Sequence, residues 1–387
     1  MTRQRTNTAA KGNILVVDDT PANLRLLSSM LAEQGYKVRS VISGQMALTA
    51  TQAAHPDLIL LDINMPEMNG YEVCERLKAD EQTRDIPILF ISALDAIEDK
   101  VKAFTVGGLD YITKPFQFEE VLARVETHLS LRELQKRLQD ANRRFEQELA
   151  LAGEVQASFL PNNLPDIPGW QLAVTLKPAR QTSGDFYDIN PLPNGEIGIL
   201  VADVVGKGVG AALYMALSST LIRTYAAEYA TQPELVCQAV NHRILTDTQA
   251  DMFVTAFYGI LNPATGTLIY CNAGQNPPYV IGPQRSEEAQ KLGATGKPLG
   301  MFEDETWEKR VALLGSGDAL VVYTDGVVEA QDGRDELFGG NRLRNCVQTN
   351  LGRPAQDIQD AVIADICDFM DDAPQYDDIT LLVLVRE

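Results

Sequence analysis

The chain has 387 residues, which is more than one typical hydrophobic core accommodates, so two domains and a connector are expected. Its formal net charge of −20 disfavours non-specific binding to DNA, and no basic stripe offsets that charge. Apolar residues make up 45% of the sequence, an ordinary fraction for a globular protein. We therefore expect a globular protein with no nucleic-acid partner.

The cysteines and the N-terminus indicate the compartment. Five scattered cysteines without a CxxC pair are typical of reduced thiols in a cytoplasm: Cys74, Cys237, Cys271, Cys346 and Cys367. Residues 1–12 are polar, lack the apolar core of a secretory signal and are expected to be a disordered tail. No uninterrupted apolar stretch reaches about 20 residues, so we expect a cytoplasmic protein without a membrane span.

Polar side chains follow the apolar runs that predict strands in the first third of the chain. Each run ends at a carboxylate, a hydroxyl or an ammonium group: Asp18 and Asp19, Asp62, Ser92, and Lys114. Because the carboxyl ends of parallel strands converge at one edge of a sheet, we expect these groups to meet in one crevice. Three crowded carboxylates repel one another unless a divalent cation lies between them, and Mg²⁺ prefers such oxygen ligands.

Residues 13–130, which contain this set, closely resemble the receiver domain of bacterial two-component response regulators. The resemblance implies a doubly wound, flavodoxin-like α/β fold that is phosphorylated by a histidine kinase or phosphotransfer protein. Asp62, in Leu61-Asp62-Ile63-Asn64-Met65-Pro66, is implied as the phosphoacceptor. The alternative is that ordinary polar residues end the strands of another flavodoxin-like domain, which the matching order and spacing disfavour.

The receiver resemblance also implies the roles of the other residues. Mg²⁺ would be held by Asp18, Asp19, Asp62 and the backbone carbonyl of Asn64. Lys114 would pair with the phosphoryl group, and the Lys114–Pro115 peptide bond is expected to be cis. The implied switch pair is Ser92 and Tyr111, in which the hydroxyl moves to the phosphate and the ring follows.

Residues 131–160 carry an apolar stripe with coiled-coil spacing. Apolar residues recur in steps of three and four, interrupted only at Glu148: Leu131, Leu134, Leu138, Ala141, Phe145, Ala152, Val155 and Phe159. Pro161 is expected to end the helix. One interpretation is a single amphipathic helix packed on one of the domains. The other is a parallel coiled coil that forms a homodimer and transmits a signal, which the narrow stripe between two domains favours.

Aspartates recur at predicted strand ends in residues 161–387. They are Asp185 in Ser183-Gly184-Asp185-Phe186, Asp203 after a strand, Asp325 in Thr324-Asp325-Gly326, and the pair Asp377-Asp378 before the last strand. No histidine lies near any of them in the sequence, and an all-oxygen set indicates Mg²⁺ or Mn²⁺ rather than zinc. Asp-Gly turns would explain Asp325 alone, but not the whole series.

This arrangement resembles the metal-dependent serine/threonine phosphatases of the PPM class, most closely their bacterial SpoIIE-type branch. The resemblance covers about residues 155–387, and residues 161–387 are expected to be the phosphatase domain. It implies an α+β fold, a β-sandwich flanked by helices, with two Mn²⁺ or Mg²⁺ ions between the sheets.

The PPM resemblance assigns roles to single residues. Asp203 would bridge both ions and the Val204 carbonyl would add an oxygen, while Asp325 and Asp377 would bind the ions. Asp185 would bind a metal directly or orient a ligand, and Asp378 would orient a neighbour. The implied phosphate-binding residue is Arg180.

The sequence as a whole predicts a phosphorylation-controlled protein serine/threonine phosphatase. Its expected substrate is a phosphoserine or phosphothreonine protein, such as an anti-sigma-factor antagonist. Val205 stands where larger relatives place a histidine general acid, so the proton for the leaving group is expected from water or the substrate. The alternative is an adaptor whose receiver gates partner binding to an inert PPM fold; the intact aspartates favour the enzyme.

Overall fold

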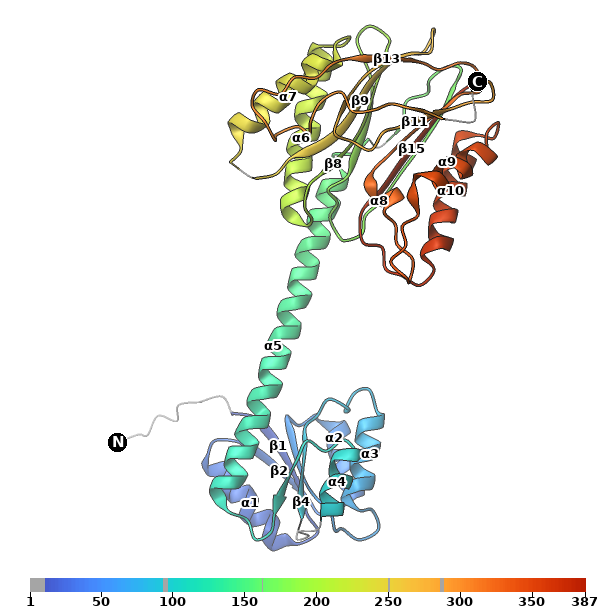
Figure 1. Cartoon of the computed structure of the whole chain (residues 1–387). Coiled ribbons are helices and arrows are strands. Elements are labelled where there is room, and N and C mark those ends of the chain that lie inside the picture. Colours follow the sequence, from blue (N-terminus) through green and yellow to red (C-terminus); the bar gives the residue numbers. More distant parts are fainter. Residues whose placement is uncertain (1–10, 93–96, 162, 250, 286–288) are drawn as a thin grey trace. The chain divides into compact units, whose positions relative to one another are not determined.

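The computed structural model describes the chain except for residues 1–10, 93–96, 162, 250 and 286–288. It divides into two compact units, Met1–Arg144 and Phe145–Glu387 (Figure 1). Residues 1–10 of the predicted tail lie outside the described residues. No helix in the described part of the chain is long and apolar enough to cross a membrane.

The first unit is built around a parallel sheet with the strand order β2-β1-β3-β4-β5. Its elements alternate along the chain: β1 (Asn13–Val17), α1 (Pro21–Glu33), β2 (Lys37–Val41), α2 (Gly44–Ala53), β3 (Leu58–Asp62), α3 (Gly70–Ala79), β4 (Ile88–Ser92), α4 (Ile97–Thr105) and β5 (Asp110–Thr113). One apolar cluster packs α1 and the start of the next helix, α5 (Phe118–Ala157), on one face, and another packs α2, α3 and α4 on the opposite face. This confirms the predicted flavodoxin-like fold.

The strand order places the three predicted metal ligands together. The order reverses between β1 and β3, and ligands of doubly wound sheets bind at such a switch point beyond the carboxyl ends of the strands. Beyond β3 the chain returns so close to Asp62 that a Cβ on Gly70 would lie 2.3 Å from the Asp62 carbonyl oxygen, so this position requires glycine. A capping box between Asn69 and Glu72 then starts α3.

Helix α5 (Phe118–Ala157) contains the boundary between the two units. It begins inside the predicted receiver and includes most of residues 131–160, so the connector starts without a break in the helix. The large apolar side chains that the helix contributes to the stripe are more than half exposed: Leu131, Leu134, Leu138, Phe145 and Val155. The stripe is therefore not buried against the chain's own domains, and the coiled coil remains a prediction.

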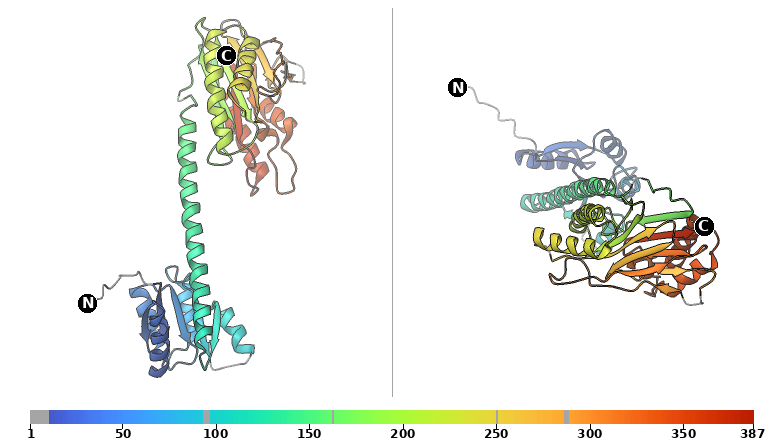
Figure 2. Two further views of the ribbon diagram at one scale, coloured as in Figure 1. Left: turned by 90° about the vertical axis from the view of Figure 1, so that its left-hand side faces the viewer. Right: turned by 90° about the horizontal axis from the view of Figure 1, so that it is seen from above.

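The second unit is a sandwich of two antiparallel sheets, with the orders β13-β10-β9-β8-β7 and β12-β11-β14-β15-β6 (Figure 2). After α5 its elements are β6 (Trp170–Lys177), β7 (Phe186–Pro191), β8 (Ile197–Val204), α6 (Val209–Glu228), α7 (Pro233–Asp247), β9 (Val254–Asn262), β10 (Thr267–Ala273), β11 (Tyr279–Ile281), β12 (Gln290–Lys291), β13 (Arg310–Leu313), β14 (Ala319–Tyr323), α8 (Asp325–Val328), α9 (Gly339–Thr349), α10 (Ala355–Met370) and β15 (Ile379–Arg386).

Three apolar clusters account for the layers of this unit. One fills the space between the two sheets. The second packs α6 and α7 on the outer face of the β8 sheet, and the third packs α9 and α10 on the outer face of the β15 sheet. The predicted β-sandwich flanked by helices is therefore confirmed.

Candidate phosphoacceptor and metal sites

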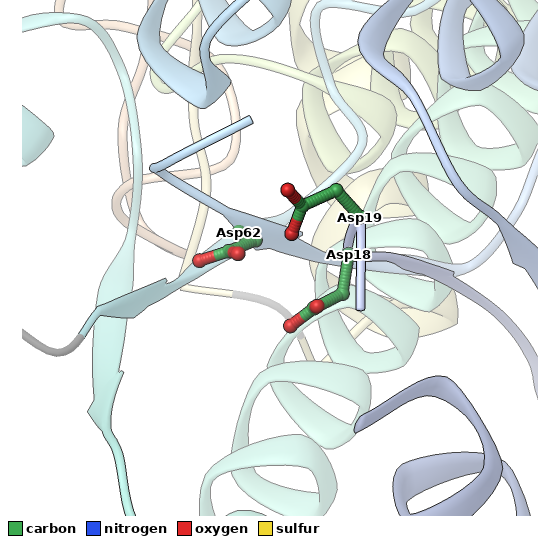
Figure 3. Close-up of side chains that lie close together, drawn as sticks. All are labelled: Asp18, Asp19 and Asp62. Atoms are coloured by element: carbon green, nitrogen blue, oxygen red, sulfur yellow. The ribbon is translucent and has the colours of Figure 1, made fainter. Parts of the chain in front are cut away.

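The first unit brings three aspartates to the switch point of its sheet. Asp18 and Asp19 follow β1, Asp62 ends β3, and one carboxylate oxygen from each lies within 4.8 Å of the others (Figure 3). Asp18 and Asp62 are buried, whereas Asp19 is exposed to solvent. Three oxygen donors at this separation fit a hard divalent cation such as Mg²⁺.

Lys114, just beyond β5, neutralises two of these carboxylates. Its Nζ lies 2.9 Å from Asp18 Oδ2 and 3.0 Å from Asp62 Oδ2. Burial raises the pKa of Asp62, and the hydrogen bond from Lys114 offsets part of that effect. The Lys114–Pro115 peptide bond is cis, as predicted.

The other predicted receiver residues lie around this group. Ser92 ends β4, and Tyr111 lies on the neighbouring strand β5, where its ring contacts Phe104 at a centroid distance of 6.3 Å. Asn64 is exposed, and its backbone N–H donates to Asp62. The metal role of the Asn64 carbonyl and the switch role of Ser92 and Tyr111 remain predictions.

The second unit buries Asp185 in a set of hydroxyl donors. Its Oδ2 accepts hydrogen bonds of 2.6 Å from both Thr324 Oγ1 and Thr380 Oγ1. The Asp203 carboxylate lies close enough for its charge to act on Asp185. Burial and the charge of Asp203 together raise the pKa of Asp185 well above its ordinary value.

Asp203, near the end of β8, lies at the centre of the acidic group. Burial and then the charge of Asp325 raise the pKa of Asp203 to about 7, with a further contribution from Asp377. Burial and the charge of Asp377 likewise raise the pKa of Asp325. Such mutual repulsion is relieved by a bound cation, so the donor set fits Mg²⁺ or Mn²⁺.

These four aspartates are less tightly gathered than those of the first unit. Among the described residues, Asp18, Asp19 and Asp62 are the one group of three or more acidic residues in which one oxygen from each lies within 4.8 Å of the others. The aspartates around Asp203 would therefore share more than one ion or draw together around one.

Two glycines let the backbone segments of the acidic centre approach each other. A Cβ on Gly184 would lie 2.9 Å from the Val204 carbonyl oxygen and 3.1 Å from Asp203 Oδ1. A Cβ on Gly326 would lie 1.9 Å from the carbonyl oxygen of Asp378. Any side chain at either position would separate the segments that carry the aspartates.

Asp378 has its carboxylate turned to the loop before β7. Its Oδ1 accepts from the Ala179 N–H at 2.7 Å, and its Oδ2 accepts from Ser183 Oγ at 2.7 Å and the Gly184 N–H at 2.8 Å. This geometry suits the predicted role of orienting a neighbour. Arg180 lies exposed in the same loop, and its phosphate-binding role remains a prediction.

Comparison with known proteins identifies both units. Residues 193–387, half of the chain, match the family model described as Stage II sporulation protein E (SpoIIE), and residues 14–126 match the response regulator receiver domain. The chain belongs to the SpoIIE family. The matched SpoIIE region contains Asp203, Asp325 and Asp377, while Asp185 lies just before it.

Three curated proteins are similar in sequence to parts of this chain. Protein IcfG of Synechocystis is 32% identical over 267 residues, which is 62% of this chain and 41% of IcfG. Phosphoserine phosphatase RsbU of Bacillus subtilis is 27% identical over 262 residues, which is 68% of this chain and 75% of RsbU. The transcriptional regulator RpaA of Synechocystis is 45% identical over 116 residues, 30% of this chain and 48% of RpaA. The chain thus spans less than half the length of IcfG and RpaA.

Two solved structures share the fold of the SpoIIE unit. The SiaA-PP2C domain of Pseudomonas aeruginosa matches 64% of this chain and 99% of its own length, with a TM-score of 0.57 and 21% identity. The RsbU and RsbW domains of Rv1364c from Mycobacterium tuberculosis match 59% of this chain and 63% of that chain, with a TM-score of 0.51 and 27% identity. The SpoIIE unit therefore has a PP2C-like fold.

Two polar contacts at these sites were not identified from the sequence. Asn23, in the first turn of α1, donates through Nδ2 to Asp18 Oδ1 at 3.0 Å and Oδ2 at 2.9 Å. Lys207, in the loop after β8, places Nζ 3.0 Å from Asp377 Oδ2. The sequence could have pointed to Lys207, because it lies in the Gly206-Lys207-Gly208 segment close to Asp203. No feature of the sequence points to Asn23.

The acidic centre of the SpoIIE unit should make the metal-free protein less stable as pH rises. Burial and neighbouring charges raise the pKa of Asp203 from its ordinary value of 3.8 to about 7 in the folded chain, so the folded chain binds this proton more tightly than the unfolded chain. Stability is therefore lost between about pH 4 and 7. In chelator near pH 8, Asp203→Asn should raise the free energy of unfolding by at most about 4 kcal/mol, and with it the melting temperature. This gain should vanish near pH 4. Calorimetry over this range checks it, and a gain that does not vary with pH would contradict it.

Proposed function

We propose that this chain is a response regulator in which phosphorylation of Asp62 controls a metal-dependent protein serine/threonine phosphatase. The observation that carries the proposal is the group of aspartates around Asp203 on a PP2C-like fold, in one chain with a receiver unit. The name of the relative RsbU, a phosphoserine phosphatase, supports this reaction.

The acidic centre provides the groups that the reaction needs. Asp203, Asp325 and Asp377 would hold Mn²⁺ or Mg²⁺, which when bound polarises a phosphoryl group and supplies hydroxide at neutral pH. Asp185 is fixed by two threonine hydroxyls and faces Asp203, so it would position that ligand. Arg180 lies exposed in the neighbouring loop, where it would bind the phosphate of the substrate.

The receiver unit provides the input. Asp18 and Asp19 would hold Mg²⁺ beside Asp62, and Lys114 is already within 3.0 Å of Asp62. A histidine kinase or phosphotransfer protein would supply the phosphoryl group. Ser92 and Tyr111 would then change the surface of the receiver, and α5, which runs on into the SpoIIE unit, would transmit the change.

Hydrolysis by the purified chain tests this function. With Mn²⁺ or Mg²⁺, we expect release of phosphate from a phosphoserine protein, an anti-sigma-factor antagonist being the first choice, or from an aryl phosphate. Excess chelator should stop it. The candidate adaptor would instead bind the phosphoprotein without turnover, so binding without phosphate release at saturating metal would favour the adaptor.

The α5 stripe should mediate dimerisation. Leu134 and Leu138 are exposed on one face, and an a/d stripe buries its side chains only against another helix. Leu134→Lys with Leu138→Lys would place like charges in the seam, so light scattering should show monomers in which both units still melt as in the wild type. The control, Gln139→Lys with Gln147→Lys, adds the same charge outside the stripe and should remain dimeric. A wild-type chain that is monomeric at tens of micromolar, with and without a phosphoryl mimic, would rule out the coiled coil.

A further inference from the structure

The last turns of α5 lie directly against the loop that leads to Asp185. A Cβ on Gly153 would lie 2.1 Å from the carbonyl oxygen of Gln181, a separation that no side chain tolerates. The helix and the loop are therefore in backbone contact at this point, and only glycine allows it.

Gln156, almost one turn later, holds the same loop through both ends of its amide. Its Oε1 accepts a hydrogen bond from the Ser183 N–H at 2.9 Å, and its Nε2 donates to the Ser183 carbonyl oxygen. The Gln156 side chain is buried, with 7% of the residue exposed. A buried amide that pairs with both backbone groups of one residue fixes that residue, since loss of the amide leaves both groups unsatisfied.

The fixed residue is directly connected to the acidic centre. Ser183 Oγ donates to Asp378, and the adjacent Gly184 lies against the carboxylate of Asp203. The next residue, Asp185, is close enough to Asp203 for the charge of Asp203 to act on its carboxyl group. A displacement of Ser183 would therefore move Gly184 and Asp185 relative to Asp203.

We propose that Gln156 is a positioning residue for the metal centre. It holds the loop of residues 181–185 where Asp185 meets Asp203, and so makes metal affinity depend on the position of the end of α5. Because α5 is one helix from Phe118 to Ala157, this contact is where a movement of the helix reaches the centre. The inference deepens the proposed function and rests on it.

Calorimetric titration of the full chain with Mn²⁺ tests the inference directly when every protein also carries Asp18→Asn and Asp19→Asn, because these two changes remove the oxygen donors of the receiver site. Gln156→Ala should weaken Mn²⁺ binding by about 10- to 100-fold, the usual effect of removing a group that orients a metal ligand. Saturating Mn²⁺ should restore most of kcat, with the KM for an aryl phosphate unchanged. The matched control is Gln147→Ala, which makes the same change at an exposed position of the same helix and should leave Mn²⁺ affinity unaltered.

A second variant keeps the test decisive if Gln156→Ala does not fold. Gln156→Glu retains the acceptor for the Ser183 N–H but sets a carboxylate against the Ser183 carbonyl, so Mn²⁺ binding should again weaken and amide exchange at Ser183 should quicken. Wild-type Mn²⁺ affinity in a folded Gln156 variant overturns the inference, even if its melting temperature is lower. A chain with intact Gln156 and the two receiver changes that binds no Mn²⁺ overturns the metal assignment of the SpoIIE unit itself, and this titration alone distinguishes that failure.

Discussion

Asp203→Asn should lower the phosphatase rate at saturating Mn²⁺ on the order of a thousandfold, which corresponds to a loss of several kcal/mol of transition-state stabilisation. Asp203 lies at the centre of the acidic group, where its charge interacts with those of Asp185, Asp325 and Asp377. Asparagine keeps the size of the side chain and removes the charge that would hold the ions. The rate is measured as phosphate release, with Mn²⁺ binding measured in parallel.

Asp372→Asn is the control for this substitution, because it makes the same chemical change at an exposed position shortly before Asp377. Its rate and Mn²⁺ affinity should match those of the wild type. Unchanged activity in Asp203→Asn, or full wild-type activity in excess chelator, would refute the assignment of the metal centre. A melting curve of Asp203→Asn at the assay concentration of Mn²⁺ separates loss of activity from unfolding.

The aspartates of both centres were accessible from the sequence because each lies beside one end of a predicted strand. Tertiary structure alone shows what surrounds them. Asn23 reaches Asp18 only because α1 starts beside the end of β1. Lys207 meets Asp377 only because the two halves of the sandwich close on each other, and no periodicity encodes such a contact.

The connector, residues 131–160, shows that a pattern of apolar residues does not by itself locate the start of a helix. The pattern of apolar residues changes at Leu131, which predicted a domain boundary there. The helix is nevertheless continuous from Phe118 to Ala157. Val121 and Val125 are buried in the receiver core, whereas Leu134 and Leu138 are exposed. The change in pattern therefore records what the helix packs against, and not where it begins. The contact of Gln156 could not be predicted for a related reason. A polar residue near the end of an amphipathic helix is expected to face solvent, but the Gln156 amide is paired with Ser183.

Asp62→Asn should abolish phosphorylation of the chain by a small phosphodonor such as acetyl phosphate. Asp62 is buried and lies 3.0 Å from Lys114 Nζ, so a phosphoryl group added there would lie beside Lys114 and a bound Mg²⁺. The neighbouring Asp18 is already paired with Lys114 and Asn23 and is not expected to accept the group. Intact-protein mass measurement with Mg²⁺ and donor checks the expectation.

The same variant tests whether the two units communicate. In the wild type, donor should change the phosphatase rate; in Asp62→Asn the rate should be the same with and without donor. Asp85→Asn, an exposed aspartate of the same unit, should be labelled and should respond as the wild type does. Label that persists in Asp62→Asn would show that another residue accepts the phosphoryl group. A rate that still responds to donor without label on Asp62 would mean that donor reaches the SpoIIE unit by a route other than the receiver and α5.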